Sequence, residues 1–234
     1  MARTAANGKA APAPAQRRPG VREQAVIASR SNLLRAATRI FAKHGFAGGR
    51  VGQISKAAKS YDRMIYYYFG SKEGLYIAVI EDMYRRMDEA ESRLDLDASQ
   101  PVESLKEVIR FVWRYYCKNP EFVTLLNNEN LHQGKHISKL ATARQYSSQA
   151  ISLVQGLIEA GAAQGVFRTD VAARDVYLMI AAMGYFYQSN RFTLTSFLGE
   201  NLETPEALAH WESFMIDAVL RAVAPGKPMI NGAG

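Results

Sequence analysis

A short segment around residue 65 carries side chains suited to binding a polyanion. It begins at Asp62, contains Arg63, Tyr66 and Tyr67, and reads as one helix. Packing of its apolar members against a core would turn Asp62 and these three side chains outward. An arginine can form two hydrogen bonds with a guanine edge, and phenols can donate to phosphate or contact a thymine methyl group. The segment therefore predicts a helix that contacts nucleic acid.

The surrounding sequence extends this expected interface. A helical pattern at residues 51–58 precedes the segment, and a break of three or four residues separates the two, which is the outline of a helix-turn-helix. Lys72 lies near the N-terminus of the following helix, where its ammonium adds to free N–H groups and the helix dipole to form a clamp for phosphate. The candidate DNA contacts also include Arg50, Ser60 and Tyr61.

Basic charge is concentrated at the N-terminus. Residues 1–60 carry 12 Lys and Arg against a single acid, Glu23, a net charge of +11, so the other 174 residues sum to −4 of the chain's +7. Nucleic acid and an anionic membrane both fit this asymmetry. A membrane adaptor would require a basic amphipathic helix, whereas these residues lie in an arm and a compact three-helix pattern. We expect DNA binding; the alternative is a non-catalytic helical binding protein or adaptor with a membrane- or polyanion-binding end.

The spacing of apolar residues predicts an all-α protein of about nine helices. Residues 1–24, rich in Ala, Pro and basic side chains, are expected to form a disordered basic arm. A three-helix DNA-binding domain is expected over residues 25–71. Residues 72–224 are expected to form a helical effector-binding and dimerisation domain, which begins with a long helix. A loose tail is expected over residues 225–234. Gly45 is expected to end the first helix in the left-handed conformation, and residues 89–97 to form a solvated helix face.

Residues 30–80 resemble the DNA-binding domain of the TetR family of regulators. The resemblance is carried by residues 65–75, IYYYFGSKEGL, and by residues 39–46, RIFAKHGF, which match the end of that family's first helix. The resemblance implies a three-helix domain joined by a long fourth helix to a variable helical body that dimerises through its last two helices and holds an effector pocket. It places Arg63 and Tyr67 at positions that meet base edges, and Tyr66 and Lys72 at positions that bind phosphate. Residues 184–194, with Gly134-Lys135-His136 upstream, weakly resemble the subgroup that includes the pyrimidine-utilisation regulator, which implies a small polar heterocycle as effector.

The chain departs from the family's pattern at several positions. In the turn, Lys59, Ser60 and Tyr61 replace the usual Gly, apolar residue and Ser, so that Ser60 or Asp62 is expected to cap the recognition helix. Gly49-Arg50 replaces the common Ser or Thr cap of the second helix, and Gly52 stands where a long polar side chain is common. Gly74 occupies the position where a capping box would have Glu or Gln. These departures bear on the operator sequence rather than on DNA binding itself.

The sequence contains no recognisable catalytic motif that would support an enzymatic activity. No serine elbow, phosphate-binding glycine loop or catalytic carboxylate pair is visible, and no cofactor is implied. Glu129, His132 and His136 have the spacing of metal ligands, but Gly134 interrupts their helix, and a polar connector with no metal is the preferred interpretation. Cys117 is the single cysteine and is expected to be a small buried hydrophobic residue.

The second half is expected to bind a small-molecule effector and to form a homodimer on a roughly palindromic operator. Effector pockets mix aromatic with isolated polar groups, and the candidates are Trp113, Tyr116, Cys117, Asn127, Asn128, Tyr185, Gln188 and Arg191. The dimer seam is expected on Leu178, Ala181, Ala182, Phe186, Trp211, Phe214, Met215, Ala218 and Val219. No apolar run is long enough to cross a membrane and no signal peptide is recognised, so a cytoplasmic location is expected.

Overall fold

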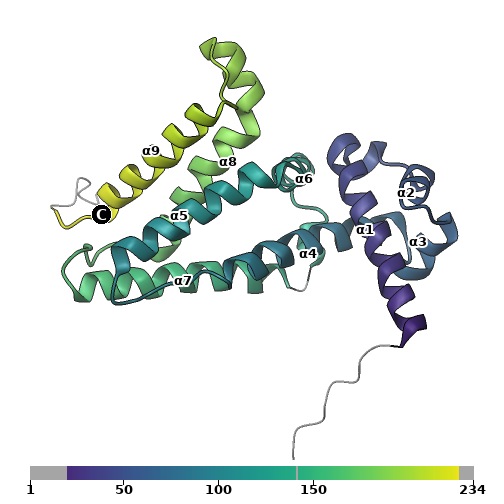
Figure 1. The fold of residues 1–234 in the computed structure, drawn as a ribbon, viewed down its shortest axis with the longest axis horizontal. Helices are drawn as coiled ribbons and strands as arrows, with labels where there is room; N and C mark the ends of the chain where they lie inside the picture. The colour runs from purple at the N-terminus through teal and green to yellow at the C-terminus, as the bar shows by residue number, and fades with distance from the viewer. Residues whose placement is uncertain (1–19, 141, 227–234) are drawn as a thin grey trace, which may run out of the picture.

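A computed structural model describes residues 20–140 and 142–226 of the 234-residue chain. In these ranges the chain forms nine α-helices and one short 3-10 helix, and no strand (Figure 1). The expected all-α fold is therefore confirmed. The helices are α1 (Val21–Gly48), α2 (Val51–Ala57), α3 (Asp62–Phe69), α4 (Lys72–Glu91), α5 (Pro101–Lys118), α6 (Pro120–Leu131), η1 (Ile137–Lys139), α7 (Ala143–Ala163), α8 (Ala173–Leu198) and α9 (Pro205–Val223).

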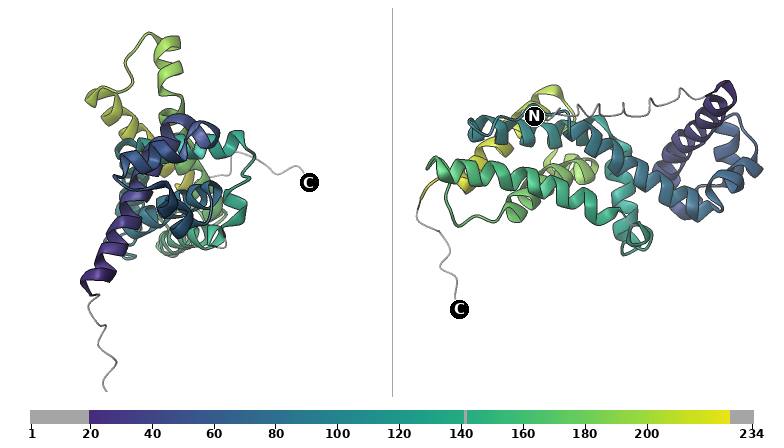
Figure 2. Two further views of the ribbon diagram at one scale, coloured as in Figure 1. Left: turned by 90° about the vertical axis from the view of Figure 1, so that its right-hand side faces the viewer. Right: turned by 90° about the horizontal axis from the view of Figure 1, so that it is seen from below.

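The molecule has a small head at one end and a longer helical body (Figure 1). Helices α1 to α3 form the head, and α4 runs from the head into the body, where it lies beside α7 (Figure 2). Helix α1 begins at Val21, so the last residues of the expected disordered arm, 21–24, belong to a helix. The remainder of the arm, residues 1–19, lies outside the described ranges. Among the described residues, no helix combines the length and apolar character that a membrane span requires.

The head is built around one apolar cluster. Phe41 of α1, Ile54 of α2 and Ile65 of α3 are each fully buried, and they hold the three helices together. Gly45 has a φ of 67° and breaks the helical path of α1 where the sequence predicted, but its ψ of 179° is extended rather than left-handed helical, and α1 continues to Gly48. Gly49 lies against the Phe41 ring, where an added Cβ would stand 2.6 Å from the nearest ring carbon. A side chain at this position would therefore have to move the core, which explains the glycine, whereas the N-cap residue of α2 is Arg50.

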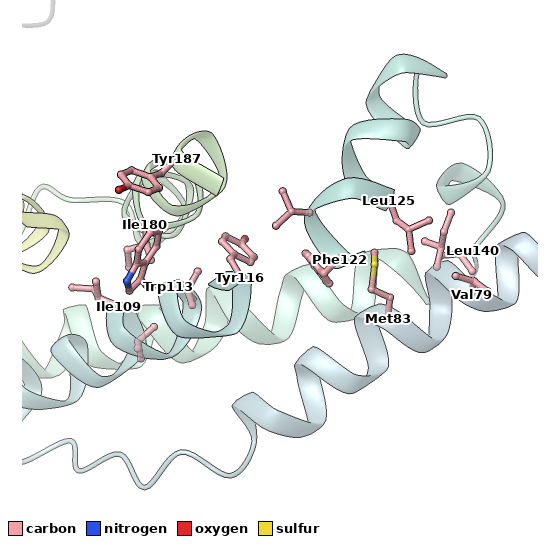
Figure 3. Close-up of a cluster of buried hydrophobic side chains, with 14 of the residues drawn as sticks. Val79, Met83, Ile109, Trp113, Tyr116, Phe122, Leu125, Leu140, Ile180 and Tyr187 are labelled. Carbon is pink, nitrogen blue, oxygen red and sulfur yellow. The ribbon is translucent and has the colours of Figure 1, made fainter. Parts of the chain in front are cut away.

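The body packs α5 against α7, α8 and α9. Trp113 of α5 meets Tyr187 of α8 edge to face, with ring centroids 5.2 Å apart, and Ile180 lies beside them (Figure 3). Two parallel hydrogen bonds, 2.8 and 2.7 Å long, connect the Arg114 guanidinium to the Glu212 carboxylate and link α5 to α9. These contacts fix the body as one packed unit.

Candidate DNA interface and effector cavity

Helix α3 has one buried side and one open side. Ile65 anchors it in the core, while Tyr66 is 53% and Tyr67 76% exposed. Arg63 is exposed as well, and its guanidinium carbon lies 5.3 Å from the centre of the Tyr61 ring, which is itself 71% exposed. These three phenols and the guanidinium lie in solvent and do not pack against the core, so they are available to contact a ligand.

The turn between α2 and α3 differs from the sequence expectation. Lys59 has a φ of 52°, the left-handed conformation that a glycine adopts without steric cost. The expected cap by Ser60 or Asp62 is wrong, because Tyr61 is the N-cap residue and no side chain caps the helix. The Asp62 carboxylate instead accepts a hydrogen bond from the Ser55 hydroxyl, which is buried in α2. This bond ties the start of α3 to α2, so the acid orients the helix.

Lys72 connects α4 to the end of α1. Its ammonium donates to the Ala47 carbonyl over 3.2 Å and lies 4.9 Å from the centre of the Phe46 ring. The Ser71 hydroxyl caps α4 by accepting from the Gly74 N–H over 2.9 Å. An added Cβ at Gly74 would stand 2.1 Å from the Phe69 carbonyl oxygen, so the close approach of α3 to α4 excludes the Glu or Gln of a capping box.

A buried acid and a buried histidine lie where the head meets the body. Glu129 of α6 and His136 are each 2% exposed. The Glu129 carboxylate accepts from the His136 ring over 2.7 Å and from the backbone N–H groups of His136 and Ile137 over 3.1 and 3.0 Å. His132, the third member of the candidate metal set, is exposed. No group of three or more His, Cys, Asp or Glu in the described ranges is placed to hold a metal ion.

The His136 ring reaches the head itself. Its centroid is 4.7 Å from that of Phe46 and 4.8 Å from that of Tyr76, on α1 and α4. Glu73 of α4 accepts from Lys139 over 2.6 Å close by. Burial alone would raise the pKa of Glu129, but the bonds from Ile137 and His136 lower it below its usual value. The carboxylate is thus ionised at neutral pH and joins α6 and the loop after it to the α1–α4 contact.

A hollow lies in the body, between α4, α5, α6, α7 and α8. It has a volume of about 420 Å³, which is within the range of small-molecule sites. Its wall is mostly apolar and aromatic. The polar and aromatic lining residues are Tyr84, Asp88 and Glu91 of α4, Tyr116 of α5, Phe122 of α6, and Tyr177 and Tyr185 of α8.

Two of the predicted effector residues, Tyr116 and Tyr185, line this cavity, and Asn127 contacts Tyr185 without being part of the lining. The Tyr185 hydroxyl donates to the Asn127 side-chain oxygen and accepts from Asn130 over 3.2 Å, so its ring is held in place. Trp113 is not on the cavity, since it is 2% exposed in the α5–α8 core (Figure 3).

The remaining candidates also make contacts elsewhere. The Gln188 amide donates to the half-buried Cys117 sulfur over 3.2 Å. Arg191 pairs with Glu203 over 3.0 Å. The Asn128 side-chain oxygen would stand 3.7 Å from a Cβ built on Gly45, so this residue faces the head.

Sequence reasoning missed the contribution of α4 to this cavity. Residues 89–97 were expected to be a solvated face, but Glu91 is only 8% exposed. Tyr84, Asp88 and Glu91 follow one another at spacings of four and three, which places them on one side of a helix. That spacing was the feature of the sequence that could have indicated a shared face of α4 toward the cavity.

The expected dimer seam also needs correction. Leu178, Ala181 and Ala182 line the cavity. Met215 and Val219 are fully buried within the subunit, so they cannot meet a partner. Of the expected seam, Phe186 is 57% and Phe214 48% exposed.

Family models match both parts of the chain. Residues 33–79 match the bacterial regulatory proteins of the tetR family, and residues 101–219 match the Tetracyclin repressor-like, C-terminal domain. The chain is also 49% identical over 207 residues to the HTH-type transcriptional repressor NicS of Pseudomonas putida, a match that covers 88% of this chain and 98% of the relative. The chain belongs to the TetR family. It is therefore a helix-turn-helix transcriptional regulator rather than an enzyme.

Further comparisons agree with this family. HTH-type transcriptional regulator RutR of Escherichia coli is 42% identical over 64 residues, 27% of this chain and 30% of the relative. A TetR family regulator from Marinobacter aquaeolei VT8 shares the fold with a TM-score of 0.64 at 21% identity, over 87% of this chain and 99% of that one. One from Haloarcula marismortui has a TM-score of 0.65 at 17% identity, over 84% and 98%. None of these matches tests the weaker resemblance of residues 184–194, which stays a prediction.

Proposed function

We propose that this protein is a dimeric repressor that inserts α3 of each subunit into the major groove of a palindromic operator and leaves the operator when a small molecule occupies the α4–α8 cavity. The observation that carries the proposal is the open side of α3, with Arg63, Tyr66 and Tyr67 in solvent and Ile65 in the core. Repression follows the named function of the relative that is 49% identical. The protein acts in the cytoplasm, where chromosomal DNA is accessible.

The residues divide by role. Arg63 and Tyr67 contact base edges, while Tyr61, Tyr66, Arg50, Ser60 and Lys72 contact phosphates, and Asp62 orients the helix through Ser55. Two recognition helices related by a two-fold axis require half-sites about one helical turn apart, roughly 34–36 Å. The basic arm around Arg17 and Arg18 adds phosphate or minor-groove contacts.

The dimer forms through α8 and α9. These helices expose several large apolar side chains that a single subunit leaves in water, which is typical of an interface. They are Phe186, Phe192, Phe197, Leu198 and Phe214.

Helix α4 couples the cavity to the head. Lys72 at its first residue bonds the end of α1, and Glu91 at its last residue lines the cavity, about 30 Å away along the axis. The Glu129–His136 contact joins α6, which also lines the cavity, to the same end of α1. A ligand that prefers one arrangement of these helices changes the spacing of the two heads and weakens operator binding.

The test compares Arg63→Ala with Arg174→Ala in band-shift titrations. Arg174 is a matched control because it lies on α8 with a 72% exposed side chain and the same charge. Arg63→Ala is expected to cost about 1–3 kcal/mol on the operator and to relax the preference at one base pair. Arg174→Ala is expected to bind like the wild type. An equal loss from Arg63→Ala on every DNA sequence would refute its role as a base-reading residue.

A further inference from the structure

The wall of the effector cavity has a one-sided charge. Asp88 and Glu91 of α4 both line it, and its described lining contains no Lys, Arg or His. A cavity that removes its contents from water strengthens every charge interaction inside it. The field of these two acids therefore favours a positive ligand and opposes a negative one.

Tyrosine rings enclose the same space. Tyr84 comes from α4, Tyr116 from α5, and Tyr177 and Tyr185 from α8. The face of an aromatic ring attracts a cation, and flat molecules pack between such rings. Burial raises the pKa of Tyr84 to about 12 and raises those of Tyr116 and Tyr177 as well, so these phenols stay neutral at physiological pH.

Glu91 lines the cavity, and its side chain has no charged or hydrogen-bonding partner in the described part of the subunit. It is 8% exposed, and none of the hydrogen bonds or ion pairs between described residues involves its carboxylate. Burial and the charge of Asp88 raise the pKa of Glu91 to about 7. A buried acid without a partner is costly, and a positively charged ligand would remove that cost by pairing with it.

We propose that the effector is a small aromatic cation, with one or two rings packed among Tyr84, Tyr116, Tyr177 and Tyr185 and a positively charged nitrogen held by Glu91 and Asp88. This assignment rests on the proposed function, since it names the chemical class of that regulator's effector. The cavity volume of about 420 Å³ suits a molecule of this size. The mouth of the site includes Leu178, which is 53% exposed on α8.

The test uses three probes of similar shape and different charge: N-methylquinolinium, 1-methylnaphthalene and 1-naphthoate. Binding to the full-length protein is measured by calorimetry or tyrosine fluorescence. The cation is expected to bind about tenfold or more tightly than the neutral and anionic probes. Tighter or equal binding of 1-naphthoate, or no detectable binding of the cation at millimolar concentration, would overturn the proposal.

Variants assign the effect to Glu91. Glu91→Gln is expected to lose most of the cation's advantage and to leave binding of 1-methylnaphthalene unchanged. Glu89→Gln is the matched control, because Glu89 lies on the same helix but is exposed and pairs with Arg85. Equal affinity of wild type and Glu91→Gln for the cation contradicts the proposal. Glu91→Asp alters the packing but keeps the charge, so it is expected to retain the preference for the cation.

The same proteins separate this inference from the proposed function. If the ligand-free protein selects no operator, the proposed function fails, whereas the binding data still decide the chemistry of the cavity. If the operator is bound but the cation is not preferred, the proposed class of effector is wrong, whereas the proposed function as a DNA-binding regulator remains supported.

Discussion

Removal of the Glu129 carboxylate should destabilise the protein far more than a surface change would. The side chain is 2% exposed and accepts three hydrogen bonds of 2.7, 3.0 and 3.1 Å. A hydrogen bond to a charged group contributes about 1.5–3 kcal/mol. Three such bonds are not additive, because water can enter the space that Glu129→Ala leaves. The expected loss in the free energy of unfolding is therefore about 3–5 kcal/mol, the range found when one partner of a buried pair is removed.

Glu129→Gln provides the control for this experiment. Its single carbonyl oxygen can still accept from the backbone N–H groups of His136 and Ile137, and its amide can donate to the His136 ring if the ring changes tautomer. We expect it to retain most of the stability. Urea unfolding of both variants at one fixed protein concentration, followed by circular dichroism, gives the two differences. A loss below about 1 kcal/mol for Glu129→Ala would refute the structural argument.

The same contact predicts a dependence on pH. The pKa of Glu129 is lowered in the folded protein, so its stabilisation is fully present above the unfolded value of about 4.3 and is lost as the pH falls through the folded value. The difference in stability between wild type and Glu129→Ala should therefore shrink in acid. A difference that grows as the pH falls would mean that the carboxylate is not the stabilising form.

Three further changes test other parts of the structure. Lys72→Ala should weaken binding to all DNA sequences and reduce the salt slope by about one unit; an unchanged slope in titrations at several salt concentrations would exclude a phosphate contact. Gly74→Ala should cost at least about 2 kcal/mol in thermal unfolding, because its Cβ would stand 2.1 Å from the Phe69 carbonyl oxygen, and wild-type stability would show that this approach is not maintained. Phe186→Glu should yield folded monomers in analytical ultracentrifugation, whereas the same change at Leu131, which is 80% exposed on α6, should leave the dimer intact; a dimer in both would place the interface elsewhere.

The head could be predicted closely because its sequence pattern is local. Apolar spacing places Phe41, Ile54 and Ile65 on the sides of three short helices that must face one another, and all three are fully buried. The reasons for the departures at Gly49 and Gly74 could not be predicted, because they depend on how closely Phe41 and the Phe69 carbonyl approach these two positions. Such distances follow from tertiary packing.

The cavity was harder to predict because its lining comes from five helices. Aromatic residues on α5 and α8 were expected to face it, and Tyr116 and Tyr185 do, but Trp113 packs in the core instead. An aromatic residue at helical spacing fits either place, and only the packing of neighbouring helices decides between them. Glu91 was overlooked because an acid near a helix end usually lies in solvent.

Selection of binding sites from a random double-stranded DNA pool, at near-physiological salt with the full-length protein, shows whether α3 reads DNA sequence. We expect enrichment of a palindrome with half-sites about one helical turn apart, roughly 34–36 Å, and loss of this enrichment with Arg63→Ala. Recovery of unrelated sequences bound only through salt-sensitive contacts would show that the open side of α3 does not read bases.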